Sequence, residues 1–134
     1  MDVAAIVGPS GSGKTTLLVA LIRHFVTEGR TVGAIKHTHH ALPEADHGDT
    51  ATFARAGARP VILAGNGEAI VIGAGRVRFD SPAELLAQFD TDIVLIEGFK
   101  DFDGWPRIEA MPFRDALAQL ARIWRTANGS GRIR

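Results

Sequence analysis

The chain contains no cysteine among its 134 residues, which excludes disulfide scaffolds, thiolate zinc sites and cysteine nucleophiles together. It also lacks a long apolar run, since stretches such as Ile93–Ile96 are far too short to cross a bilayer. Charge of one sign is not in excess either, because 15 basic side chains balance 15 acidic ones. We therefore expect no membrane span and no nucleic-acid partner. Residues 3–7 are apolar and follow no charged leader, so a cytoplasmic protein is expected.

The balanced charge hides an asymmetry along the chain. Residues 107–134 carry six arginines against Glu109 and Asp115, whereas residues 1–106 carry nine basic and thirteen acidic groups. Two interpretations stay open. The arginines could form a solvated helix face, or they could form a docking surface for an acidic partner or a second subunit.

Short apolar runs alternate with helical patterns along the sequence. Strands are predicted at residues 3–7, 31–36, 60–64, 69–72, 76–79, 92–97 and 107–110. Helices are predicted at residues 15–28, 49–57 and 81–89, and from residue 113 onward. Asp49 is interpreted as an N-cap, and Ser81 with Glu84 as a capping box. The pattern predicts an α/β fold with a mainly parallel central sheet flanked by helices, which binds ligands at the carboxyl ends of its strands.

The segment from residue 8 to residue 15, Gly-Pro-Ser-Gly-Ser-Gly-Lys-Thr, matches the P-loop (Walker A) pattern G-x-x-x-x-G-K-[ST] at every fixed position. It lies between a predicted strand and a predicted helix, as phosphate binding requires. We expect Lys14 to reach the β- and γ-phosphates, Thr15 to ligate Mg²⁺ and Thr16 to contact the α-phosphate. The predicted nucleotide-binding residues are Gly8, Pro9, Ser10, Gly11, Ser12, Gly13, Lys14, Thr15 and Thr16. Residues 1–127 are interpreted as one P-loop NTPase-like domain and 128–134 as a frayed tail.

A P-loop also needs an acidic residue at the end of a neighbouring strand to hold Mg²⁺. Glu97 ends an apolar strand and is the first candidate, and Asp49 is the second, with a simple helix cap as its alternative. Lys36 ends the second predicted strand and Lys100 follows Glu97 closely. Lys36 is a candidate contact of the γ-phosphate, with an ordinary surface lysine as the alternative. Lys100 could reach the phosphates or a partner.

Four of the five histidines lie close together in the sequence, at His37, His39, His40 and His47. Three interpretations stay open: transition-metal binding, contact with the phosphates or a substrate, and an uncommitted polar loop. Adjacent His39 and His40 point apart in an extended chain, so at most two or three of the rings could converge.

Together with the P-loop, two further segments resemble the molybdopterin-guanine dinucleotide biosynthesis adaptor family (MobB). One is Val-Gly-Ala-Ile-Lys-His-Thr-His-His at residues 32–40, continuing through Asp46, residues 48–50 and Phe53 to residues 56–58. The other is Ile-Glu-Gly-Phe-Lys at residues 96–100, with residues 106–109 behind it. The resemblance implies a homodimeric GTP-binding protein with weak hydrolysis, which works with the guanylyltransferase that joins GMP to molybdopterin. It also implies that Asp49 and Glu97 belong to the Mg²⁺ and phosphate site.

The sequence departs from this resemblance near the nucleotide base. It contains no Asn-Lys-x-Asp motif, so a preference for guanine follows from the resemblance alone. From Met111 an arginine-rich helix replaces the further strand and loop of the family. Two alternatives to the adaptor function stay open. One is an ATP-dependent small-molecule kinase or ligase, and the other is a GTPase metallochaperone that carries its metal on the histidine loop. Strands predicted between Pro60 and Phe79 leave sheet edges that a second copy could cover.

Overall fold

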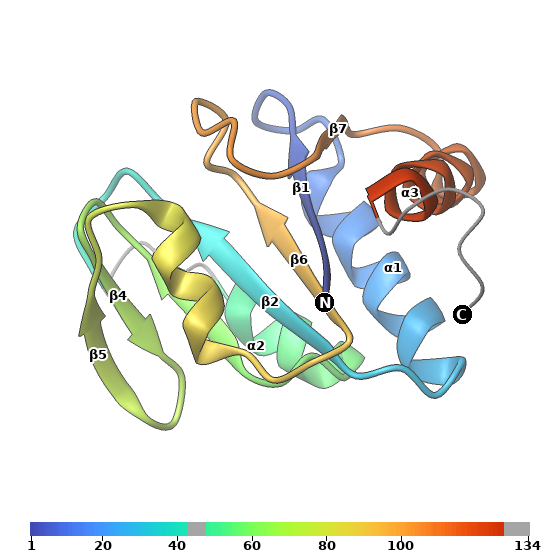
Figure 1. Ribbon diagram of the computed structural model, residues 1–134. Coiled ribbons are helices and arrows are strands. Elements are labelled where there is room, and N and C mark those ends of the chain that lie inside the picture. Colours follow the sequence, from blue (N-terminus) through green and yellow to red (C-terminus); the bar gives the residue numbers. More distant parts are fainter. Residues whose placement is uncertain (43–47, 128–134) are drawn as a thin grey trace.

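One sheet forms the centre of the molecule in the computed structural model, which describes residues 1–42 and 48–127 (Figure 1). Its strands are β1 (Asp2–Val7), β2 (Val32–His37), β3 (Val61–Ala64), β4 (Glu68–Val71), β5 (Gly75–Arg78), β6 (Ile93–Glu97) and β7 (Arg107–Glu109). They lie in the order β5-β4-β3-β2-β6-β1-β7. The pairs from β3 to β7 are parallel, while β4 and β5 are added as antiparallel strands. The predicted α/β fold with a mainly parallel sheet is confirmed.

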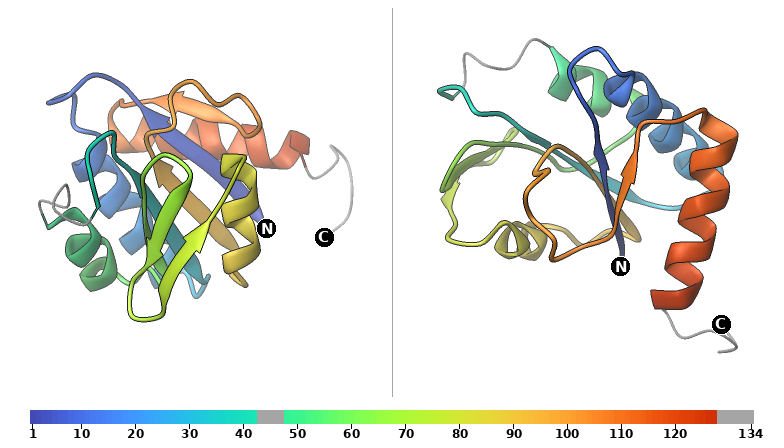
Figure 2. Two further views of the ribbon diagram at one scale, coloured as in Figure 1. Left: turned by 90° about the vertical axis from the view of Figure 1, so that its left-hand side faces the viewer. Right: turned by 90° about the horizontal axis from the view of Figure 1, so that it is seen from above.

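Helices cover the two faces of the sheet unequally (Figure 2). Helices α1 (Lys14–Thr27), α2 (Asp49–Ala56) and α3 (Phe113–Ala127) pack on one face, and the 3₁₀ helix η1 (Pro82–Gln88) packs on the other. Successive residues of a strand point to opposite faces of the sheet. Ala34 therefore packs in the core between the sheet and α1, and Ile35 packs in the core between the sheet and η1. Both faces are buried, which explains why the central strands are apolar except near their ends.

Two local predictions differ from the structure. The segment after Ser81 winds as a 3₁₀ helix, although Glu84 accepts a hydrogen bond from the Ser81 N–H at 3.2 Å as a capping box requires. The interpretation of Asp49 as an N-cap is wrong, because Gly48 is the N-cap and Asp49 is the first helical residue. The Asp49 carboxylate bonds to Lys36 instead of capping its own helix.

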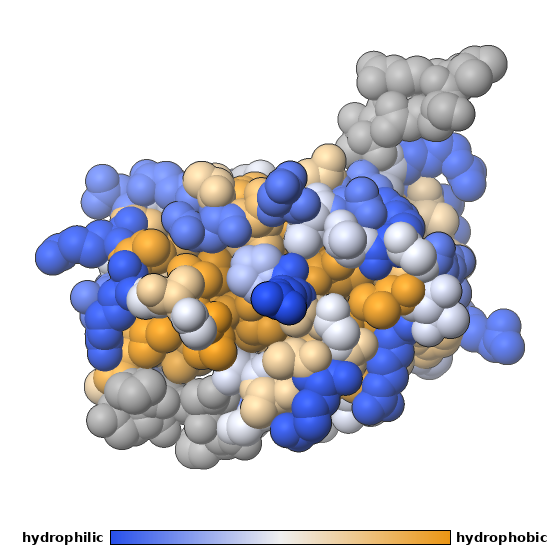
Figure 3. All heavy atoms as spheres, turned by 90° about the horizontal axis from the view of Figure 1, so that it is seen from below, coloured by the Kyte–Doolittle hydropathy of each residue, from blue (hydrophilic) through white to orange (hydrophobic). Residues whose placement is uncertain are grey.

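The carboxyl ends of β1, β2 and β6 meet at the upper edge of the sheet in Figure 1. Figure 3 shows the molecule from below, from the end of the sheet opposite these carboxyl ends. Hydrophobic residues form patches among hydrophilic ones on this surface. A cavity of about 430 Å³ lined in part by Val26, Val32 and Pro60 lies at this lower edge. Within residues 1–42 and 48–127, no helix is long and apolar enough to span a membrane. His47, Asp46 and the predicted tail 128–134 lie outside the described residues.

Candidate functional site

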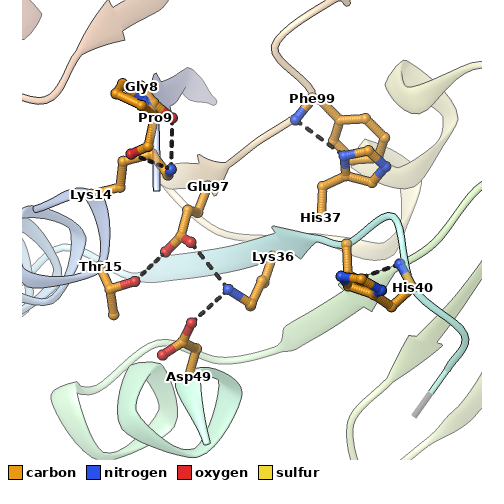
Figure 4. Close-up of polar contacts among 11 residues, drawn as sticks. Gly8, Pro9, Lys14, Thr15, Lys36, His37, His40, Asp49, Glu97 and Phe99 are labelled. Atoms are coloured by element: carbon orange, nitrogen blue, oxygen red, sulfur yellow. Dashed lines mark hydrogen bonds and ion pairs between the residues drawn. The ribbon is translucent and has the colours of Figure 1, made fainter. Parts of the chain in front are cut away.

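The P-loop connects β1 to α1 and curls around the side chain of Lys14 (Figure 4). The Lys14 Nζ donates hydrogen bonds to the carbonyl oxygen of Gly8 at 2.7 Å and to that of Pro9 at 3.1 Å. Gly8 has a φ of +152°, and a Cβ there would meet Ser12 Oγ at 2.8 Å, so the tight curl requires glycine. In this structure, the Lys14 ammonium, which the sequence predicts to bind phosphates, binds the carbonyl oxygens at the start of its own loop.

Glu97 and Thr15 meet directly behind the loop. The Thr15 hydroxyl donates a hydrogen bond to Glu97 Oε1 at 2.8 Å. Glu97 ends β6, which lies between β1 and β2, and it is only 6% exposed. A carboxylate this buried needs partners for both oxygens. The strand-end glutamate predicted from the sequence thus lies against the predicted Mg²⁺ ligand Thr15.

Lys36 joins the two candidate carboxylates (Figure 4). Its Nζ lies 2.5 Å from Asp49 Oδ2 and 3.1 Å from Glu97 Oε2. Lys36 and Glu97 are register partners on adjacent parallel strands, so the sheet itself brings their side chains together. Burial alone would lower the pKa of Lys36, but the hydrogen bond to Asp49 and the charge of Glu97 outweigh it, and the pKa lies above its ordinary value. The lysine is therefore charged and serves as the counterion of both carboxylates.

These residues line a cavity of about 420 Å³ beside the P-loop. Its side-chain oxygens include the hydroxyl of Thr15 and the carboxylates of Asp49 and Glu97, a hard donor set that fits Mg²⁺. The ammonium of Lys36 already bonds to both carboxylates, so this position accepts a cation. The cavity is lined by Ser10, Gly11, Gly13, Lys14, Thr15, Thr16, Lys36, Asp49 and Glu97.

His37 is committed to the fold through both of its ring nitrogens. Nδ1 accepts a hydrogen bond from the Phe99 N–H at 3.4 Å, and Nε2 lies 3.3 Å from Asn66 Oδ1. The ring also stacks on Phe99 with centroids 3.9 Å apart and an interplanar angle of 12°. Burial lowers the pKa of His37, so it is neutral at pH 7, with the proton on Nε2.

The other described histidines do not assemble a metal site with His37. His39 meets the His37 ring edge-on at 4.7 Å, and the backbone N–H of His40 bonds to Thr38 Oγ1. Among the described residues, no three histidine, aspartate or glutamate side chains group closely enough to hold a metal ion. His47 lies outside that part of the chain.

Lys100 is exposed and takes no part in the ion pairs that join Lys36 to Asp49 and Glu97. It lines two cavities with His37 and His39, one that extends to the P-loop and one that extends away from it. Sequence reasoning assigned no role to Asn66 or Phe79, which line the second cavity. Asn66 lies in a Gly-Asn-Gly turn that signals only a turn, and its contact with His37 is visible only in the fold.

Comparison with known proteins places the chain in a family. The sequence profile described as "Molybdopterin guanine dinucleotide synthesis protein B" (MobB) matches residues 3–125. A relative from Haemophilus influenzae, named "Molybdopterin-guanine dinucleotide biosynthesis adapter protein", is 43% identical over 99 residues, 71% of this chain and 55% of the relative. A relative of the same name from Escherichia coli is 36% identical over 96 residues, 68% of this chain and 55% of the relative.

The chain therefore spans about half the length of these curated relatives. The fold is also similar to a solved structure, the crystal structure of MobB from Bacillus subtilis. The TM-score is 0.52 at 26% sequence identity, and the match covers 89% of this chain and 73% of that one. A P-loop NTPase-like fold, the profile match and the two relatives agree, and the chain belongs to the MobB family.

Proposed function

We propose that this chain binds GTP with Mg²⁺ and acts as an adapter in the biosynthesis of molybdopterin-guanine dinucleotide. The convergence of Thr15, Asp49 and Glu97 beside the P-loop carries the proposal, because it supplies a cation site next to a phosphate site. The names of the relatives supply the pathway. Guanine as the base follows from the product that those names describe.

The P-loop, the two threonines and the two carboxylates divide the binding of phosphate and cation in this proposal. The N–H groups of the loop and the positive end of α1 bind phosphate oxygens, and Lys14 turns from the Gly8 and Pro9 carbonyls to the β- and γ-phosphates. Thr15, Asp49 and Glu97 hold Mg²⁺, which neutralises phosphate charge. Thr16 contacts the α-phosphate.

Hydrolysis by this chain alone is expected to be slow. The cavity beside the P-loop is lined by no arginine and no glutamine among the described residues. Those side chains stabilise transition-state charge or orient water in fast P-loop hydrolases, and supplying them can change the rate by about 10³–10⁵-fold. The chain is at most a slow GTPase until a partner supplies such a group.

The partner in this proposal is the guanylyltransferase that joins GMP to molybdopterin. The test is a reconstituted synthesis with limiting guanylyltransferase, with and without this chain. We expect the chain to increase the yield of guanine dinucleotide, and Lys14→Ala to remove that increase while circular dichroism stays unchanged. A yield that is the same with the chain, the variant or neither would refute the adapter function.

A second copy of this chain is the other proposed partner. The sheet ends at β5 and β7. Antiparallel pairing of two β7 strands about buried Ile108 places exposed Arg107 opposite Glu109, an attractive pair. The same pairing of two β5 strands about Val77 places Arg76 opposite Arg78, two cations that gain no attraction across the interface, and Arg76 already pairs with Glu68 of its own chain. We therefore propose a dimer through β7.

Light scattering after gel filtration tests this dimer. Glu109→Arg should shift the chain toward monomer, because arginines then face each other across the interface. The double variant Arg107→Glu with Glu109→Arg should restore the dimer by reversing both charges. Dimers that are insensitive to Glu109→Arg would place the interface elsewhere.

A further inference from the structure

We propose that the cavity lined by Phe79, Phe99 and Phe102, whose lining includes no P-loop residue, binds a second ligand, a fused heteroaromatic ring with an amino-pyrimidinone edge and an anionic group. The cavity measures about 380 Å³, a size that accommodates a bicyclic ring. It is built from the end of β2, the β3–β4 turn, the segment after β5 and the segment after β6. The inference rests on the proposed function, in which the P-loop holds the nucleotide.

Aromatic side chains form the walls of this cavity. Phe79, Phe99 and Phe102 line it together with the rings of His37 and His39. Phe79 meets Phe99 edge-on at 6.2 Å, and the His37 ring stacks on Phe99 with centroids 3.9 Å apart. Such walls bind the flat faces of aromatic ligands.

Phe99, which contributes to this wall, has a backbone conformation that is unfavourable for a phenylalanine. Phe99 has a φ of +52°, a conformation that bulky residues avoid, and it follows Gly98 with a φ of +106°. The Phe99 N–H donates a hydrogen bond to His37 Nδ1. The other ring nitrogen of His37, Nε2, contacts Asn66 Oδ1. The wall is therefore fixed before any ligand arrives.

Charged groups stand around the opening of the cavity. Asp80, Lys100 and Asp101 line it and are exposed, and no ion pair joins any of them to another side chain within the described residues. A carboxylate accepts two parallel N–H groups from an amino-pyrimidinone edge, and an ammonium attracts an anionic group. A single ligand with an amino-pyrimidinone edge and an anionic group could therefore bind to a carboxylate and to the Lys100 ammonium together.

The cavity adjoins the phosphate site. A neighbouring cavity of about 350 Å³ shares His37, His39, Phe99 and Lys100 with it and extends to Ser10 and Lys14 of the P-loop. Figure 4 shows His37 and Phe99 beside the Lys36 and Glu97 cluster. A ligand in the aromatic cavity can therefore direct its anionic group toward the nucleotide phosphates.

Two molecules carry the required edge. Guanine and pterin both contain the 2-amino-4-oxopyrimidine ring, and the family description contains both a pterin and guanine. We assign the cavity to a pterin, because the P-loop nucleotide already accounts for the guanine. Occupation by the nucleotide's own base is the competing outcome, and the experiment separates the two.

The test is calorimetry of the full chain with pterin-6-carboxylate, which carries the edge and one anionic group. We expect saturable binding that Asp101→Asn and Lys100→Ala each weaken at least tenfold. Asp103→Asn is the matched control, since Asp103 is also exposed but does not line the cavity. All three positions are exposed, so these substitutions leave the core intact.

Lys14→Ala separates this inference from the proposed function. The variant should lose GTP while it binds pterin-6-carboxylate as the unmodified chain does. The inference is overturned by an absence of saturable pterin binding, by equal effects of Asp101→Asn and Asp103→Asn, or by competition in which GTP displaces the pterin. Failure of GTP to bind, with pterin binding intact, would overturn only the proposed function.

Discussion

The ammonium of Lys36 lies 2.5 Å from the carboxylate of Asp49, and this contact ties the first residue of α2 to the end of β2. The same ammonium reaches Glu97 at 3.1 Å, so one cation holds two acidic groups in place. These are also the oxygens that we assign to Mg²⁺. Lys36 and Mg²⁺ therefore compete for the same groups, and nucleotide binding has to release the lysine.

Lys36→Met should destabilise the metal-free protein by about 2 kcal/mol, because the buried carboxylate of Glu97 and the partly buried one of Asp49 lose their counterion. Millimolar Mg²⁺ should then raise the unfolding midpoint of the variant more than that of the unmodified chain. Urea unfolding with and without Mg²⁺ measures both effects. Arg76→Met, which breaks an exposed pair with Glu68, is the control and should cost less than about 1 kcal/mol.

Glu97→Gln should remove the Mg²⁺ dependence of GTP binding. The amide oxygen can still accept the Thr15 hydrogen bond, but the negative charge that attracts the cation is gone. We expect affinity in Mg²⁺ to fall at least tenfold, toward the value in EDTA. Calorimetry of the variant in Mg²⁺ and in EDTA checks this. The control is Glu68→Gln, since Glu68 is an exposed side chain on β4. An unchanged Mg²⁺ effect in Glu97→Gln would exclude Glu97 from the cation site.

Stability should fall as the pH drops from 7 to 5, in part through His37. Its pKa is lowered in the folded protein by burial, so the unfolded chain binds a proton more readily. The contribution is complete above the unfolded pKa of about 6.5 and is lost as the pH falls toward the folded value. His37→Asn keeps an acceptor for the Phe99 N–H and should show a shallower decline of the melting temperature. Parallel declines in both proteins would contradict the assigned pKa direction.

Gly98→Ala should destabilise the fold more than Gly73→Ala. Both glycines have positive φ, +106° and +83°, so each substitution costs about 1 kcal/mol in backbone strain. A Cβ at Gly98 would also lie 2.8 Å from His37 Cβ, whereas nothing lies within 4 Å of one at Gly73. Denaturant unfolding of the two variants measures the difference. Equal losses would mean that the His37–Phe99 wall adjusts freely.

Much of this architecture could be predicted from local pattern. The apolar runs ending at Val7 and Glu97 predicted buried parallel strands, and the P-loop spacing located the turn between β1 and α1. Glu97 could be predicted as a site residue because a carboxylate at the end of a buried strand has few structural reasons to be there.

The contacts between segments could not be predicted in the same way. The misassigned cap at Asp49 shows why: aspartate is a good N-cap locally, but the ammonium of Lys36, which is 13 residues away, binds its carboxylate. The pairing of Asn66 with His37 spans 29 residues and depends on β2 lying beside β3. Such relations follow from strand order, which no local pattern specifies.

The most direct test of the account is calorimetry of GTP and ATP binding to the purified chain, in Mg²⁺ and in EDTA, with Lys14→Ala alongside. We predict saturable, Mg²⁺-dependent binding that favours GTP and is lost in Lys14→Ala. Binding of neither nucleotide, a preference for ATP, or GTP binding that survives Lys14→Ala would contradict it.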